Sequence, residues 1–227
     1  MTMLAYTQVV PTVFGGTAST LALLVLLLEF GMLRQALLRG QVRLYAAQSL
    51  AVSVLAAVVA FGHNVPELYA LAVLSLLLKV IAVPVLIVRL LREAPDAIAD
   101  SGAVGVANAV LISIAVATFG FFAVGALGIS SEVLPTIALS LAMSVVLVAF
   151  VLMIVRRDVV SQAIGFFSLE NGASLASLVV AAGMPLLLEV AFLFDLLVAV
   201  GVFGLLARTH HRRAQTLSTA ALDRLRG

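Results

Sequence analysis

The chain consists largely of apolar runs of about twenty residues that follow one another with short separators. An α-helix of that length crosses the hydrocarbon core of a bilayer, which is about 30 Å thick. Glycine and proline separate the second run from the third (Gly62 to Pro66) and the sixth from the seventh (Gly183 to Pro185), which predicts two tight hairpins. The runs lie at about 12–33, 43–62, 66–90, 103–127, 133–154, 161–182 and 185–207. We therefore expect an all-α integral membrane protein with about seven transmembrane helices.

Composition supports this class and narrows the chemistry. Hydrophobic residues make up 63% of the 227 residues and charged residues 11%, with a mean hydropathy of +1.24, whereas soluble domains are nearer half apolar. The ten-residue alternation of a transmembrane barrel is absent. Cysteine is absent as well, which excludes thiolate metal sites and cysteine-ligated iron–sulfur clusters. No nucleophile–base group, phosphate loop or metal-ligand spacing stands out, so no cofactor is expected in this chain.

The basic residues predict orientation rather than nucleic-acid binding. They sit between the apolar runs, and no basic stripe is interleaved with aromatic residues. Arginines near helix ends stay on the cytoplasmic side, and with seven spans they all fall on one face: Arg34, Arg39, Arg43, Arg89, Arg92, Arg156, Arg157, Arg208, Arg212, Arg213, Arg224 and Arg226. The other face carries only His63, Glu67 and Glu132 as ionisable groups. The N-terminus is expected outside and the C-terminus inside, in the inner (plasma) membrane, with the first apolar run retained.

Four segments follow from this topology. Residues 1–102 hold the first three helices and a cytoplasmic loop, 103–132 the fourth helix, 133–207 a three-helix unit, and 208–227 a basic cytoplasmic tail. Counted from the hairpin prolines, Gln48 and Lys79 lie 18 and 13 residues away, and Glu170 and Asp195 lie 15 and 10 away. Gln48 is thus three residues farther from its proline than Glu170 is, and Lys79 is three residues farther from its proline than Asp195 is. This similarity in spacing predicts a degenerate parallel repeat, in which Gln48 occupies the position equivalent to Glu170, and Lys79 the position equivalent to Asp195.

Five ionisable side chains fall inside the predicted spans: Glu29, Lys79, Glu170, Glu189 and Asp195. Each costs about 2.5–3.5 kcal/mol at the centre of a membrane helix, so such residues usually mark ion pathways. Lys79, Glu170 and Asp195 lie near the middle of their spans. Glu29 is nearer the cytoplasmic end and Glu189 nearer the outer end. We predict an ion-translocation site built from these five residues.

Structural roles are open for the same residues. Glu29 has room to snorkel toward the headgroups or to pair with Arg34. Glu189 stands in the first turns of its helix, where the helix dipole favours a carboxylate. Glu170 and Asp195 are also compatible with a buried pair that locks the bundle.

Lys79 is expected to act as the counter-charge of the carboxylates or as a link in a relay. Pro84, five residues later, lacks a backbone N–H and is expected to kink its helix and free a carbonyl group. Gln48, Asn108 and Asn171 are interpreted as interhelical hydrogen-bonding residues.

A family resemblance rests on two stretches of the last third. The stretch Gly165-Phe-Phe-Ser-Leu-Glu-Asn-Gly-Ala-Ser-Leu-Ala, followed by the stretch from Gly183 to Val200 with Glu189 and Asp195, resembles component E of hydrogenase-4 and related membrane-bound hydrogenases. The last three helices in turn resemble the K (4L) subunit of respiratory complex I, which carries embedded glutamates in its second and third helices. Glu170 fits the first. Asp195, thirteen residues before Arg208, fits the second better than Glu189 does.

The resemblance implies a non-catalytic membrane subunit of an energy-converting complex. Its partners would be antiporter-like membrane subunits and a peripheral, metal-bearing arm, and its buried charges would move protons or sodium ions when electrons pass through that arm. A stand-alone secondary ion transporter or channel is the alternative. A retinal-type photoreceptor fits poorly, because the only lysine is in the third span and tryptophan is absent.

Overall fold

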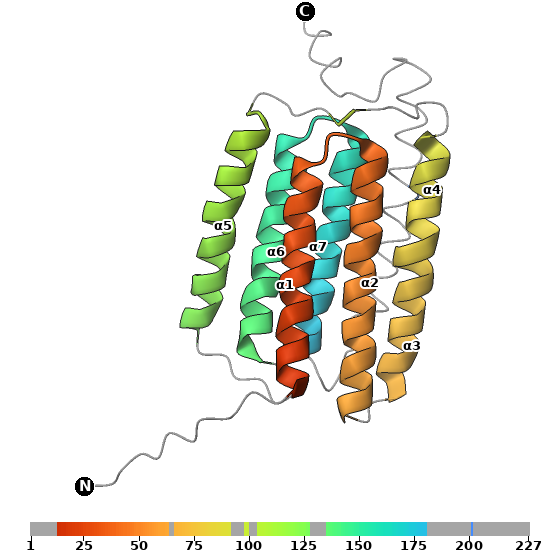
Figure 1. Cartoon of the computed structure of the whole chain (residues 1–227), viewed down its shortest axis with the longest axis vertical. Helices are drawn as coiled ribbons and strands as arrows, with labels where there is room; N and C mark the ends of the chain where they lie inside the picture. The colour runs from red at the N-terminus through yellow and green to blue at the C-terminus, as the bar shows by residue number, and fades with distance from the viewer. Residues whose placement is uncertain are drawn as a thin grey trace, which may run out of the picture.

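The computed structural model describes residues 13–63, 66–91, 98–99, 104–127, 135–180 and 201. The chain in these ranges is helical apart from short connections. The elements are α1 (Val13–Arg34), α2 (Leu38–His63), α3 (Pro66–Ser75), η1 (Leu76–Ala82), α4 (Val83–Leu90), α5 (Val106–Ala126), α6 (Thr136–Val155) and α7 (Val159–Val180). α3, η1 and α4 form one continuous rod (Figure 1).

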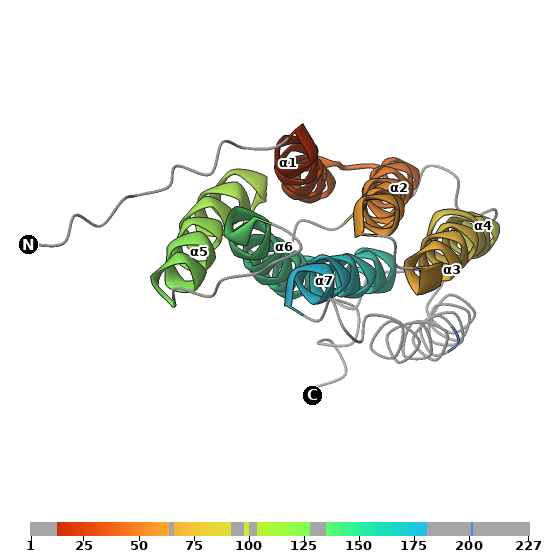
Figure 2. The same cartoon turned by 90° about the horizontal axis from the view of Figure 1, so that it is seen from below.

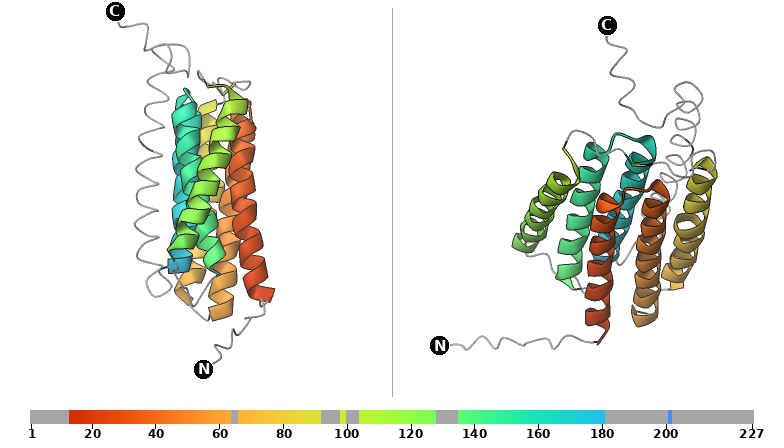
Figure 3. Two further views of the ribbon diagram at one scale, coloured as in Figure 1. Left: turned by 90° about the vertical axis from the view of Figure 1, so that its left-hand side faces the viewer. Right: turned by 45° about the horizontal axis from the view of Figure 1, so that its top comes forward.

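The helices stand side by side in two rows. Seen along the bundle axis, α1, α2 and the α3–η1–α4 rod form one row, and α5, α6 and α7 form the other (Figure 2). Their axes are nearly parallel, and consecutive helices run in opposite directions (Figures 1 and 3). α2 faces α7 across the two rows, and α1 faces α6. Long apolar helices pack in this way because each satisfies its own backbone hydrogen bonds within the bilayer.

Six helical segments of the described residues are long and apolar enough to cross a membrane. Their bounds are Gly15–Arg34, Leu38–Phe61, Leu68–Arg89, Val106–Ala126, Thr136–Val155 and Val159–Val180. They match the first six predicted spans to within a few residues, which confirms a multi-pass helical architecture. The predicted seventh span and the basic tail lie outside the described residues, apart from Gly201.

The end of the bundle that carries the arginines is tied together by side chain to backbone hydrogen bonds. Arg156, buried between α6 and α7, donates to the carbonyl oxygens of Leu33 (2.5 Å), Gln35 (3.2 Å) and Ala99 (3.4 Å). These carbonyls belong to the end of α1, the α1–α2 connection and the 98–99 segment, so one guanidinium joins three parts of the chain. The carboxylate of Asp158 accepts from the Ser161 N–H at 2.7 Å and caps the start of α7.

α2 begins five residues earlier than predicted. The prediction of a loop that reaches Arg43 was wrong, because Arg39 and Arg43 lie in the first turns of α2 and only residues 35–37 connect it to α1. Hydropathy underestimates the length of such a helix, because charged residues at its end lie at the depth of the headgroups, where an apolar side chain is not required.

The third span changes its winding at its centre. Leu76–Ala82 is a π-helix, and the Val83 N–H bonds to the Leu78 carbonyl, five residues back. Pro84 follows directly, in the first turn of α4. Proline cannot donate in the α-helical pattern and its ring crowds the carbonyl four residues earlier, so the wider winding accommodates it. The sequence predicts a kink and a freed carbonyl group near Pro84; the structure has a π-helix before it, and Lys79 lies within the π-helical turns.

Candidate ion-translocation site

A layer of buried polar side chains separates the two apolar clusters of the bundle. One cluster lies toward the arginine-bearing end and includes Met32, Tyr45, Val83 and Phe167, and the other includes Val25. Along α1, α2, η1 and α7 the sequence turns polar between these clusters. We call this set the polar layer: Glu29, Gln48, Ser49, Lys79, Ser168, Glu170, Asn171 and Ser174, all at most 4% exposed.

The centre of the polar layer is an ion pair between the third span and α7. The Lys79 ammonium lies 2.9 Å from Glu170 Oε1, and it also donates to the Ser174 hydroxyl at 2.9 Å. Glu170 stands about midway between the ends of α7, and Lys79 is fully buried. The two charges therefore meet near the middle of the predicted membrane, where each would be costly to ionise without the other.

Glu29 belongs to a second part of the same layer. Its Oε2 atom accepts a hydrogen bond from Gln48 Nε2 at 2.8 Å and another from the Ser168 hydroxyl. The side chain is 0% exposed, so the snorkelling role considered for Glu29 was wrong. Depth along a helix can be counted from sequence, but the face on which a residue lies decides whether it turns inward, and α1 directs Glu29 toward α2 and α7.

Neutral side chains continue the layer from Glu29 across α2 and α7. Asn171 Nδ2 donates to Gln48 Oε1 (3.0 Å) and to the Ser49 hydroxyl (2.9 Å). Tyr45, one turn before Ser49, packs on Phe167, with the ring centroids 5.9 Å apart. Hydrogen-bonded side chains thus extend from Glu29 on α1 through Gln48 on α2 to Asn171 on α7, the residue next to Glu170 in the sequence.

The structure brings together three of the five predicted site residues: Glu29, Lys79 and Glu170. The other two, Glu189 and Asp195, lie outside the described residues. Gln48 and Asn171 make the interhelical hydrogen bonds that were predicted for them, whereas Asn108 is exposed and donates to the Val104 carbonyl, which lies just before its own helix.

Ser168 was missed by the sequence analysis. Serine is common in membrane helices as a small residue at packing contacts. The signal that distinguishes Ser168 is its position two residues before Glu170, in the stretch that resembles component E.

The polar layer contains two carboxyl groups and one ammonium group, each of which can gain or lose a proton. Among the described residues no group of three or more histidine, cysteine, aspartate or glutamate side chains converges in the way that a metal site needs. Ionisable groups buried in contact can each change charge in response to the other, and Lys79 and Glu170 are in such contact at 2.9 Å. That property is what an ion relay requires.

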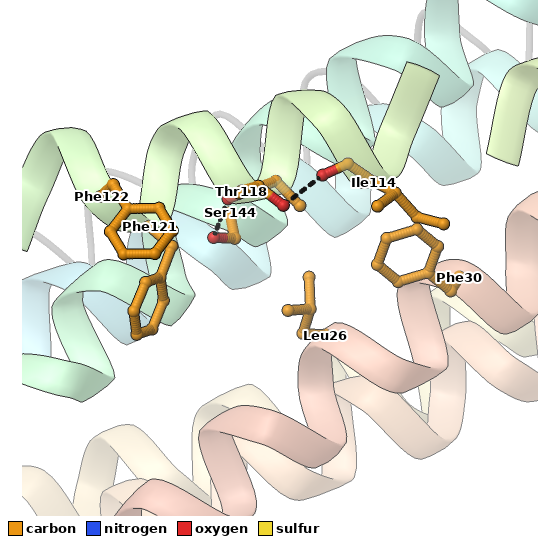
Figure 4. Close-up of a pocket in the computed structure, with 8 residues that line it drawn as sticks. Leu26, Phe30, Ile114, Thr118, Phe121, Phe122 and Ser144 are labelled. Atoms are coloured by element: carbon orange, nitrogen blue, oxygen red, sulfur yellow. Dashed lines mark hydrogen bonds between the residues drawn. The ribbon is translucent and has the colours of Figure 1, made fainter. Parts of the chain in front are cut away.

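A separate groove of about 290 Å³ opens between α1, α5 and α6 (Figure 4). Phenylalanine and aliphatic side chains line most of it, including Leu26, Phe30 and Phe121. Its two hydroxyl groups are already bonded within the protein, Thr118 to the Ile114 carbonyl (2.7 Å) and Ser144 to the Ala117 carbonyl (2.8 Å). No ionisable side chain lines the groove, so it is not part of the polar layer.

Six apolar helices around a buried charged layer define a multi-pass α-helical membrane protein. The chain belongs to the same family as the uncharacterized protein Rv0085 of Mycobacterium tuberculosis, to which it is 33% identical over 191 residues, 83% of this chain and 85% of the relative.

More distant relatives carry a functional name. Hydrogenase-4 component E of Escherichia coli K12 is 26% identical to the chain over 183 residues, which cover 81% of the chain and 85% of the relative. The component E of Shigella flexneri matches to the same extent. No protein-family model and no solved structure matches the chain. The distant similarity therefore covers most of the chain.

Proposed function

We propose that this protein is a membrane-arm subunit of an energy-converting complex of the hydrogenase-4 and complex I type. In this proposal the chain has no catalytic centre of its own. Its buried charges move protons or sodium ions across the inner (plasma) membrane while metal-bearing partner subunits transfer electrons. Antiporter-like membrane subunits are its expected neighbours, and the arginine-bearing end of the bundle faces the cytoplasm.

The observation that carries the proposal is the Lys79–Glu170 pair near the middle of the bundle. A lysine and a glutamate that only held two helices together would be an expensive choice, because well-packed apolar residues of similar volume are often as stabilising as a buried ion pair. Intramembrane charges of this kind are typical of proton relays and ion pathways. A third ionisable group, Glu29, lies in the same polar layer, and its hydrogen-bonded partners extend to Asn171, the residue next to Glu170 in the sequence.

The similarity to component E supports the same proposal from an independent direction. It extends over 81% of the chain, so it is not confined to one motif. Within this proposal the last three helices form the K-like unit, Glu170 is its first embedded carboxylate and Asp195, rather than Glu189, is the second.

Isolation from native membranes in mild detergent tests the proposal. We expect the chain to copurify with antiporter-like membrane subunits and a metal-bearing peripheral arm. Reconstituted into vesicles, the assembly should accumulate ions when reduced methyl viologen supplies electrons. A monodisperse single protein that moves ions without any electron donor would contradict the proposal and establish the stand-alone transporter instead.

A further inference from the structure

The Ser168 hydroxyl lies between two acceptors on two different helices. On one side is Glu29 Oε2 of α1, and on the other is Gln48 Oε1 of α2 at 2.9 Å. A serine hydroxyl has one hydrogen to donate and two lone pairs that accept. It therefore donates to only one of these oxygens at a time.

The surroundings of Gln48 fix which way its amide points. Its Nε2 atom faces two acceptors, the Val25 carbonyl (3.3 Å) and Glu29 Oε2 (2.8 Å). Its Oε1 atom faces the Asn171 amide nitrogen at 3.0 Å. Turning the amide over would set like groups against each other on both sides, so Gln48 Oε1 is held in place as an acceptor for Ser168.

Glu29 is placed to take up a proton. Gln48 and Ser168 both contact its Oε2 atom, whereas its buried Oε1 atom has no hydrogen-bond partner among the described residues. A buried oxygen that carries part of a negative charge and lacks a donor costs free energy. The neutral carboxyl group avoids much of that cost.

We propose that Ser168 reverses its hydrogen bond when Glu29 takes up a proton, and so relays the charge state of Glu29 to Gln48 and Asn171. While Glu29 is ionised, the Ser168 hydroxyl donates to Glu29 Oε2. Once the arriving proton has formed an O–H bond on Oε2, that group donates to Ser168 Oγ, and the serine hydrogen turns to Gln48 Oε1. No covalent bond of Ser168 breaks. This role rests on the proposed function and makes Ser168 a positioning residue for the ion pathway.

Few other charges bear on Glu29. α5 and α6, which pack beside α1, contain no ionisable residue. α2 carries Tyr45, with Arg39 and Arg43 in its first turns and His63 as its last residue, and α7 carries Glu170. Lys79 of η1 pairs with Glu170. α1 itself carries Arg34 in its last turn. Among the described residues, Ser168 and Gln48 are the side chains that hydrogen-bond to Glu29.

The relay also favours the proton as the ion that Glu29 handles. The reversal depends on a new O–H donor at Oε2, and a sodium ion supplies no hydrogen to donate. Sodium at that position would also meet the Gln48 N–H group, which is a donor and not a ligand.

Infrared difference spectroscopy of the full-length protein, isolated with its copurifying subunits, tests the inference. The C=O stretch of protonated Glu29 is assigned by its loss in Glu29→Gln. In Ser168→Ala we expect this band to shift to higher wavenumber, because the carboxyl O–H loses its acceptor. The accompanying shift of the Gln48 amide band should disappear.

Two further variants separate the relay from simple packing. Ser168→Thr keeps the hydroxyl and should restore both bands. Ser177→Ala is the matched control, since Ser177 is also buried on α7 but donates to the Ser174 carbonyl (2.8 Å), and it should leave both bands unchanged. A Glu29 band that is identical in wild type and Ser168→Ala overturns the inference and leaves the proposed function standing. Absence of electron-driven ion uptake by the wild-type assembly would overturn the proposed function but not the infrared result.

Discussion

At the scale of single residues, the central feature is a lysine that is fully buried in an apolar bundle. Lys79 has Glu170 and Ser174 as partners at 2.9 Å each. Removing one member of a buried pair costs about 3–5 kcal/mol, because the remaining charge is left in a medium that solvates it poorly. Replacing both members by neutral side chains of similar volume is much less costly.

A double-mutant cycle on this pair is therefore informative. Lys79→Met and Glu170→Gln should each lower the amount of folded protein that is recovered from membranes, and the double variant should recover most of it. The yield of monodisperse protein in size-exclusion chromatography measures this. Additive losses in the double variant would show that the two side chains do not interact.

The residue scale also shows how far sequence reasoning extends. Glu29, Lys79 and Glu170 are identified from sequence because a charge inside an apolar run is rare and costly. Their partners are not, since contacts between residues more than a hundred positions apart, such as Ser168 with Gln48 (2.9 Å), depend on the rotation of each helix. The hydropathy of a helix that is apolar on nearly all sides carries little information about that rotation.

At the scale of the elements, α7 has two specialised faces. Its polar residues Ser168, Asn171 and Ser174 face the α2 side and the third span, as their hydrogen bonds show. Its glycines face α6: a methyl group added at Gly172 would lie 2.8 Å from a Val146 side-chain carbon and 3.1 Å from the Val146 nitrogen. Small residues at such contacts let membrane helices approach closely.

Gly172→Ala is accordingly expected to destabilise the bundle by about 1–3 kcal/mol, as overpacked cores are. Gly125 near the end of α5 is the matched control, because nothing lies within 4 Å of a methyl group added there. Gly125→Ala should be neutral or slightly stabilising, since alanine is the better helix former. Thermal unfolding in detergent, followed by circular dichroism, compares the two. Equal midpoints would contradict the close α6–α7 contact.

At the scale of the whole molecule, the alternation of the helices places the described arginines at one end. Arg34, Arg39 and Arg43 flank the α1–α2 connection, Arg89 is in the last turn of α4, and Arg156 begins the α6–α7 connection (Figure 1). This agreement between charge and architecture was predictable, because span length and arginine position are both local properties of the sequence.

Reporter fusions test the orientation that this charge distribution predicts. A reporter inserted at His63 should be active outside the cytoplasm, and one fused after Arg226 should be active inside it. The second fusion also tests the seventh span, because an odd number of spans is required to separate the two sites in this way. Both reporters on the same side would be incompatible with the predicted topology.

The most direct test of the ion-pathway account is the number of ions moved per electron transferred, measured in reconstituted complexes matched for subunit content. Glu170→Gln keeps the size of the side chain and removes its charge, so this ratio should fall by most of its value, and Asp195→Asn should have a similar effect. Glu29→Gln should lower it less. Asp158→Asn is the control, since Asp158 is a buried carboxylate outside the polar layer and asparagine still caps α7. An unchanged ratio in both Glu170→Gln and Asp195→Asn would contradict the account and leave these carboxylates a structural role only.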